Sequence, residues 1–173
     1  GPIAAWTTLK TIGVNGYRQI IANSLESTQY FRNMINRLPF AEVVNPNSNG
    51  VATLFILKPE GFEDKSLAEI LTMPKSETDK VKNYNLNFTR YVDELNEKGE
   101  TYLAFTASDI FTVAGTNVCL GSIKAYPMSP HYNKENIDAI VSLISKLKKR
   151  YDNDENWTFK TLHYTPVDMV YRK

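Results

Sequence analysis

Few side chains in this 173-residue chain are of the types that carry out chemistry. Its two histidines, His131 and His163, lie far apart, and neither sits in a cysteine or carboxylate pattern with metal-ligand spacing, so no metal site is predicted. The single cysteine, Cys119, excludes an internal disulfide framework. Because no basic residue adjoins Cys119, the sequence favours a small apolar strand residue over a reactive thiol there.

The motifs of common catalytic sites are also missing. The sequence contains no glycine-rich phosphate loop, no serine nucleophile elbow and no paired-carboxylate motif. Asp93-Glu94 and the acidic residues of 152–155 are interpreted as solvated charge. Local chemistry therefore predicts a folded domain without a catalytic residue of its own.

The charge balance points away from several partners. A formal net charge of +1 gives no reason to expect a nucleic acid or an acidic membrane surface. A basic cluster at Lys146, Lys148, Lys149 and Arg150 ends the last expected helix, where cations are favourable, and is interpreted as a solvated face. The longest apolar runs are far too short to span a membrane. One cysteine and no disulfide fit a reducing, cytoplasmic setting.

Two apolar runs within 101–130 predict the centre of a sheet. Tyr102–Phe105 and Val118–Ile123 have strand-forming residues, and Ser108–Thr116 between them contains turn formers. We expect these runs to form neighbouring strands. Ala41–Val44 and Val51–Leu57, separated by a dense turn signal, predict two more strands.

Helical periodicity surrounds these strands. The N-terminal part predicts a short helix over Ile3–Lys10, stopped near Gly13, and a long amphipathic helix over Gly16–Leu38, ended by Pro39. In that long helix the apolar residues, among them Ile20, Ile21 and Leu25, share one face expected to point inward.

Three further helices are expected after the first strands. They are a short helix at Ser66–Thr72, a helix at Lys80–Lys98 capped by Thr78 or Asp79 and terminated by Gly99, and a helix capped by Asn133 with Ile137, Ile140, Val141, Ile144 and Leu147 inward. The resulting fold class is α+β, with a mainly antiparallel sheet of about four strands covered by helices on one side.

Two segments resemble one enzyme family. Gly1–Tyr17, with its Gly-Pro start, its tryptophan and its Gly-x-x-Gly-Tyr step, resembles the segment that follows the cofactor lysine in group II pyridoxal-phosphate-dependent amino-acid decarboxylases. Lys124–Pro130, followed by Asn133–Asp138, resembles the closing strand and last helix of the same family. The resemblance covers about residues 1–150. The family includes decarboxylases of glutamate, tyrosine, other aromatic amino acids and diaminobutyrate.

The resemblance implies the C-terminal small domain of a fold-type-I enzyme. Residues 1–15 would form the connecting helix from a large domain that precedes the chain, 16–151 the small domain and 152–173 a tail with one strand at Phe159–Tyr164. Pyridoxal 5'-phosphate would be bound upstream, because no His-Lys pair or ring-stacking histidine occurs here. The chain would then be inactive alone and, in a complete homodimer, would contribute to the amino-acid substrate cleft and the dimer interface.

The resemblance also implies site residues. Lys124 lies where the family more often has an arginine, so it would bind the substrate carboxylate; the alternative is a surface-facing strand lysine. Gly1 and Pro2 match the loop that approaches the partner's cofactor phosphate, where free N–H groups at a helix start suit an anion. The alternatives are a simple helix start or a remnant of cloning. Thr116 and Ser129 match family positions without an assigned role.

Two other functions stay open from the sequence. One is an aminotransferase-type enzyme on the same scaffold, and the other is a non-catalytic α+β interaction module. A module should have a well-covered surface, whereas a domain cut from an enzyme should expose an apolar patch. The expected patch consists of Ile3, Trp6, Leu9 and a loop at Phe111–Val113.

Overall fold

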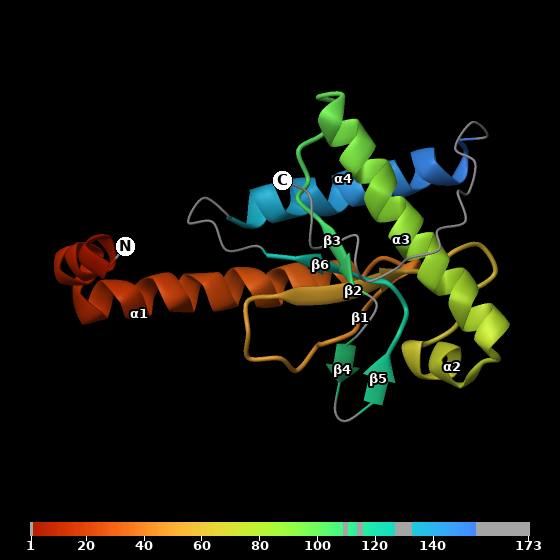
Figure 1. Cartoon of the computed structure of the whole chain (residues 1–173), viewed down its shortest axis with the longest axis horizontal. Helices are drawn as coiled ribbons and strands as arrows, with labels where there is room; N and C mark the ends of the chain where they lie inside the picture. The colour runs from red at the N-terminus through yellow and green to blue at the C-terminus, as the bar shows by residue number, and fades with distance from the viewer. Residues whose placement is uncertain (1, 109–110, 114–115, 127–132, 155–173) are drawn as a thin grey trace.

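The computed structural model describes residues 2–108, 111–113, 116–126 and 133–154. Helices and strands alternate irregularly along the chain (Figure 1). They are α1 (Pro2–Ile35), β1 (Ala41–Val43), β2 (Thr53–Leu57), α2 (Leu67–Thr72), α3 (Lys75–Glu97), β3 (Thr106–Ser108), β4 (Phe111–Val113), β5 (Thr116–Val118), β6 (Ser122–Ala125) and α4 (Lys134–Asp152).

Four strands form the main sheet, in the order β1-β2-β6-β3. Every neighbouring pair is antiparallel, with Phe55 of β2 opposite Val43 of β1 on one side and Ile123 of β6 on the other. Side chains of α1, α3 and α4 pack together with those of one face of this sheet. The predicted α+β class, with a mainly antiparallel sheet of about four strands, is therefore confirmed. The three long helices lie on one side of the sheet, whereas the short α2 packs on the other side.

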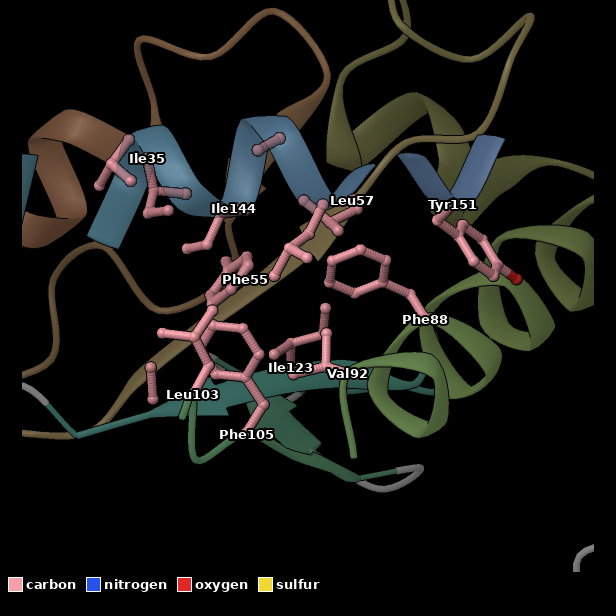
Figure 2. Packing of buried hydrophobic residues seen from close by; sticks show 14 of the residues in the cluster. Ile35, Phe55, Leu57, Phe88, Val92, Leu103, Phe105, Ile123, Ile144 and Tyr151 are labelled. Carbon is pink, nitrogen blue, oxygen red and sulfur yellow. The ribbon is translucent and has the colours of Figure 1, made fainter. Parts of the chain in front are cut away.

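Aromatic rings fill the space between the sheet and the long helices (Figure 2). The ring of Phe55 meets those of Phe31 and Phe105 edge-on, with centroids 6.2 and 6.0 Å apart. Toward the end of α4, the ring of Tyr151 packs edge-on against that of Phe88 at 5.7 Å. Edge-to-face pairs of this kind add to the free energy gained by burying each ring, so these contacts join α1, α3 and α4 to one sheet face.

The opposite sheet face has a smaller core. Leu54 and Ile56 of β2 pack with Phe62, with Ile70 of α2 and with other apolar residues of the segment between β2 and α3. The short helix α2 starts as predicted, because the Ser66 hydroxyl accepts a hydrogen bond from the Glu69 N–H while the Glu69 carboxylate accepts one from the Ser66 N–H. Consequently β2 is covered on both sides.

Helix α1 consists of two helical pieces joined at a kink. Gly13 has a φ of 67° and a ψ of 174°, outside the helical range, so the predicted break near Gly13 is confirmed. Glycine takes this conformation at little cost because it has no Cβ. In Figure 1 the N-terminal part of α1 extends beyond the sheet and the other helices. Among the described residues, no helix is long and apolar enough to cross a membrane.

The strand predictions in 101–125 are only partly correct. Tyr102–Phe105 is not a strand. The backbone N–H and C=O of Leu103 instead form hydrogen bonds with the side chain of Asn96 on α3. The adjoining strand, β3, begins at Thr106 and pairs with the central β6, which keeps the two predicted runs in contact. Val118–Ile123 is divided between β5 and β6, and Cys119 between them is exposed rather than a strand residue.

Two other predictions are wrong. Phe111–Val113 is not a loop but strand β4, which pairs with β5. Helix α3 begins at Lys75 after Pro74, without a side-chain cap, so neither Thr78 nor Asp79 caps it. Proline suits this position because a helix start leaves its N–H groups without partners anyway.

The helix ends at Gly99 and Asn133 are confirmed. Gly99 has a φ of 72° and follows α3. The Asn133 side chain accepts a hydrogen bond from the Asn136 N–H at the start of α4. The possible strand at Phe159–Tyr164 lies outside the described residues.

Two left-handed glycines allow a matched test of the turn before β6. Gly61 and Gly121 have φ values of 84° and 61°, but a Cβ at Gly61 meets nothing within 4 Å, whereas a Cβ at Gly121 meets the Lys82 carbonyl oxygen at 2.7 Å. Gly61→Ala should lower the free energy of unfolding by about 1–2 kcal/mol, the cost of the backbone conformation. Gly121→Ala should lower it by a further ~1–3 kcal/mol from overpacking.

Urea unfolding followed by circular dichroism measures both free energies. Equal losses in the two variants would contradict the close approach of α3 to the turn at Gly121.

Candidate functional site

Lys124, the residue predicted to bind a carboxylate, lies on the central strand β6. It is half-buried, and its neighbours across the sheet are Leu54 of β2 and Thr106 of β3. These three residues occupy register positions on the sheet face opposite the three long helices, because side chains alternate along each strand. The position is therefore neither a simple exposed surface site nor part of the main core.

The ammonium group of Lys124 lies over an aromatic ring. Its Nζ is 4.9 Å from the ring centroid of Tyr126, the residue that follows β6. Among the described residues no carboxylate forms an ion pair with Lys124. A cation–π contact at a partly exposed site contributes only about 0.5–1 kcal/mol. The ammonium group is thus only weakly held and is not neutralised, so it remains able to bind an anion.

The second predicted site, at the start of the chain, is away from the first. Gly1 lies outside the described residues, and Pro2 is the first residue of α1. Figure 1 shows this helix start well apart from β6. The structure therefore does not bring Pro2 and Lys124 together within this chain.

The N-terminal part of α1 exposes an apolar surface. Ile3, Trp6 and Leu9, predicted as a patch, are 82%, 62% and 54% exposed. The side chains of Phe111–Val113, the other predicted part, lie outside the described residues. Five further apolar residues of α1 are exposed: Ile12, Val14, Ile20, Ile21 and Leu25. The prediction that Ile20, Ile21 and Leu25 point inward is therefore wrong, because this part of α1 extends beyond the sheet and the other helices (Figure 1). We refer to these eight residues of α1 as the α1 apolar surface.

The threonines in the N-terminal part of α1 add little polarity to the surface of the helix. The hydroxyls of Thr7, Thr8 and Thr11 each donate to the backbone carbonyl four residues earlier. Such bonds satisfy the hydroxyl within the helix and leave the methyl group outward. From 2 to 17, Lys10 is the single charged residue. This helical segment is therefore suited to burial on more than one side.

The basic cluster of α4 is not a uniformly solvated face, as its sequence suggested. Lys148 is buried, and its Nζ lies 2.7 Å from the carboxylate of Asp152 and 5.1 Å from the ring centroid of Phe40. Asp152 also accepts a hydrogen bond of 2.5 Å from the Tyr84 hydroxyl. Burial and this carboxylate raise the pKa of Tyr84 well above its usual value. Lys148 and Asp152 thus join α4 to α3 and are not available to a ligand, whereas Lys146, Lys149 and Arg150 are exposed as predicted.

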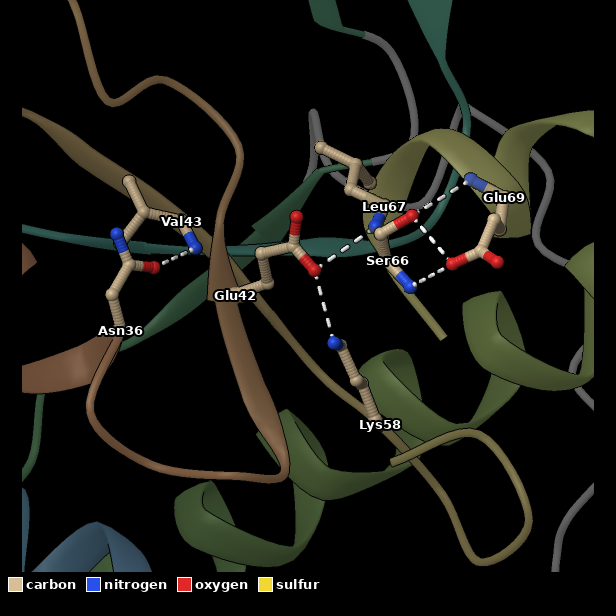
Figure 3. Close-up of polar contacts among 7 residues, drawn as sticks. All are labelled: Asn36, Glu42, Val43, Lys58, Ser66, Leu67 and Glu69. Carbon is tan, nitrogen blue, oxygen red and sulfur yellow. Dashed lines mark hydrogen bonds and ion pairs between the residues drawn. The ribbon is translucent and has the colours of Figure 1, made fainter. Parts of the chain in front are cut away.

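A second buried ion pair joins β1, β2 and α2 (Figure 3). The Glu42 carboxylate oxygen Oε2 lies 2.9 Å from Nζ of the buried Lys58 and accepts a hydrogen bond from the Leu67 N–H. Sequence reasoning missed it, because β1 and α2 are distant along the chain and carry no motif. Like the Lys148 cluster, it fixes neighbouring elements.

Neither of the two buried lysines among the described residues, Lys58 and Lys148, is available to hold pyridoxal phosphate, because both are held in ion pairs. Both histidines lie outside the described residues. A cofactor lysine must instead reach an open cavity with its amine free. No group of three or more potential metal ligands occurs in the described part of the chain.

Comparison with solved structures finds a likeness to Catharanthus roseus tryptophan decarboxylase in complex with L-tryptophan. The TM-score is 0.49 and the sequence identity 20%, over 84% of this chain and 25% of that chain. The chain thus spans about a quarter of that enzyme's length. No protein-family model matches the sequence, and no curated protein matches it. A likeness of this size identifies neither family nor activity.

The raised pKa of Tyr84 predicts a loss of stability in alkaline solution. Tyrosines of the unfolded chain lose their protons near pH 10, whereas native Tyr84 keeps its proton to higher pH. Above about pH 10 the unfolded state therefore binds fewer protons, and the free energy of unfolding falls as pH rises. Tyr84→Phe should make this fall shallower, while costing about 1 kcal/mol at neutral pH through the lost hydrogen bond.

The control for this test is Tyr102→Phe, because Tyr102 is exposed. Urea unfolding at several pH values measures the slope for each protein. The assignment of the alkaline loss of stability to Tyr84 would be contradicted by either of two results. One is a pH slope of the unfolding free energy in Tyr84→Phe that equals that of the unsubstituted chain, and the other is a shallower slope in Tyr102→Phe.

Proposed function

We propose that this chain is the C-terminal small domain of a pyridoxal-phosphate-dependent amino-acid decarboxylase and is inactive alone. The proposal rests on the resemblance of Gly1–Tyr17 and Lys124–Pro130 to that family. One structural observation supports it above others: the α1 apolar surface has no covering element among the described residues. An upstream large domain of the same polypeptide would cover it.

The physical argument concerns the cost of leaving this surface in water. Fully burying one large apolar side chain stabilises a protein by about 1.5–3 kcal/mol. Ile3, Trp6 and Leu9 gain little of this energy in the chain as described. A helix that is apolar around most of its circumference is typical of the interior of a larger protein. Exposed apolar surfaces of this kind mark sites of contact with another domain or protein.

Lys124 would be this chain's contribution to the substrate cleft. Its ammonium group has no carboxylate partner among the described residues and is only weakly held, over the Tyr126 ring. A lysine binds a carboxylate as a point charge, whereas an arginine binds it through a planar two-point fork. We therefore infer a carboxylate contact at Lys124 that is less directional than an arginine would make. The cofactor, which supplies the electron sink when bound, would be held by upstream residues.

The test uses the complete protein encoded by the natural reading frame, supplied with pyridoxal phosphate. Release of CO₂ from amino acids is expected, and Lys124→Met should raise KM by at least about tenfold through loss of a charged hydrogen bond. Lys146→Met is the matched control, because Lys146 is exposed on α4. Formation of a keto acid without CO₂ would identify an aminotransferase instead, and no reaction with any amino acid would contradict both enzymes.

The α1 apolar surface can be tested on this chain alone. A variant with Ile3, Trp6 and Leu9 replaced by serine should bind less of an apolar fluorescent dye. Its free energy of unfolding should change by less than about 0.5 kcal/mol, since these side chains lie outside the core. Serine at Asn15, Gln19 and Asn23, exposed polar residues of the same helix, is the control. A large loss of stability in the first variant would mean that the chain itself covers this surface.

A further inference from the structure

Arg32, near the end of α1, is a buried cation that forms no ion pair with a carboxylate in the described part of the chain. It is 3% exposed, and its guanidinium donates three hydrogen bonds to backbone carbonyls: Nη1 to Ser48 at 2.7 Å, and Nη2 to Gly50 at 2.8 Å and Ala52 at 2.9 Å. Burial lowers the pKa of Arg32 from its usual value. All three acceptors belong to the β1–β2 loop, residues 45–52, so the guanidinium holds that loop against α1.

The β1–β2 loop is also closed on itself. The Asn45 side chain donates to the Ala52 carbonyl at 2.9 Å and accepts from the Leu54 N–H at 2.8 Å. The Gly50 N–H donates to the Ser48 hydroxyl at 3.1 Å. The loop is thus held in its turn by its own hydrogen bonds, and three of its carbonyl groups also accept from Arg32.

Residues on either side of Arg32, at the end of α1 and just after it, reach the β1–β2 loop and β1. The Thr28 hydroxyl, one turn before Arg32, lies 3.4 Å from the Val51 carbonyl oxygen in addition to its bond to Ser24. One turn after Arg32, the Asn36 side chain accepts from the Val43 N–H of β1 at 2.8 Å (Figure 3). From residue 28 to 36, α1 is therefore fastened to β1 and to the loop that leads into β2.

We propose that Arg32 is a positioning residue that fixes the direction in which α1 leaves the domain. The half of α1 before residue 26 makes few contacts with the core, so its direction depends on how the last turns are held. The Arg32 bonds set the spacing between these turns and the sheet edge. As a result the part of the α1 apolar surface that follows the kink at Gly13, from Val14 to Leu25, is presented in one orientation. This proposal goes beyond the decarboxylase assignment and does not depend on it.

Arginine suits this role for a chemical reason. Its guanidinium is planar and has five N–H donors in a fixed arrangement, whereas lysine has one compact ammonium group. The ammonium group also has three donors, but they diverge from one nitrogen, whereas the guanidinium reaches the Ser48 carbonyl from Nη1 and the Gly50 and Ala52 carbonyls from Nη2. An apolar replacement leaves those carbonyls without partners in a buried place, which favours release of the loop.

The experiment uses this chain with two nitroxide labels, at Ala22→Cys on α1 and Ser142→Cys on α4, in a Cys119→Ser background. The distance distribution between the labels reports the direction of α1. Hydrogen exchange of the Ser48, Gly50 and Leu54 amides reports the loop. Arg32→Met should broaden the distance distribution and speed exchange of these amides at least tenfold, while the amides of β6 stay protected. In both readouts, Arg32→Lys should give values between those of the unsubstituted chain and those of Arg32→Met.

Arg37→Met is the matched control, because Arg37 is exposed at the end of the same helix, and it should change neither readout. In Arg32→Ala, added ethylguanidinium should restore the narrow distribution in a saturable way. An unchanged distribution and unchanged exchange in Arg32→Met would overturn the proposal, as would equal acceleration of loop and β6 amides. Where Arg32→Met does not fold, native behaviour of Arg32→Lys in both readouts would overturn it.

Discussion

The structure depends on one constraint, which is that strand β2 must be kept from water on both faces. All five of its residues are buried. Phe55 and Leu57 require the layer formed by α1, α3 and α4, whereas Leu54 and Ile56 require α2 and the segment around Phe62. Because a central strand cannot tolerate a polar outer face here, the helices must divide between the two sides. The long loop between β2 and α3 is thus part of the core rather than an excursion.

Local patterns predicted most of the fold because they are caused by local physics. The period of α4, the cap at Asn133 and the glycine after α3 depend on residues a few positions apart. The strand error at Tyr102–Phe105 has another cause. This run has the composition of a strand, but the Leu103 backbone bonds to the side chain of Asn96, seven residues earlier, instead of to a neighbouring strand. Composition does not reveal a competing bond from a side chain on the preceding helix.

The candidate site was predictable to a similar extent. The sequence indicated that Lys124 lies on a strand and that Ile3, Trp6 and Leu9 form an apolar patch, and the structure has both. The sequence did not show that Lys148 is buried, because charged residues near a helix end are usually solvated. Its ion-pair partner, Asp152, lies at the same helix end and looked equally solvated. The role of Arg32 was equally hidden, since backbone carbonyls leave no trace in a sequence.

The bond between Asn36 and Val43 has a consequence for how this protein can associate. Strand β1 lies at the edge of the sheet, and its outward N–H groups, on Ala41 and Val43, already donate to the Leu38 carbonyl and the Asn36 side chain. A strand that paired with β1 through these donors would first have to break both bonds. Growth of the sheet at the β1 edge, the step that edge-to-edge aggregation requires, is therefore disfavoured.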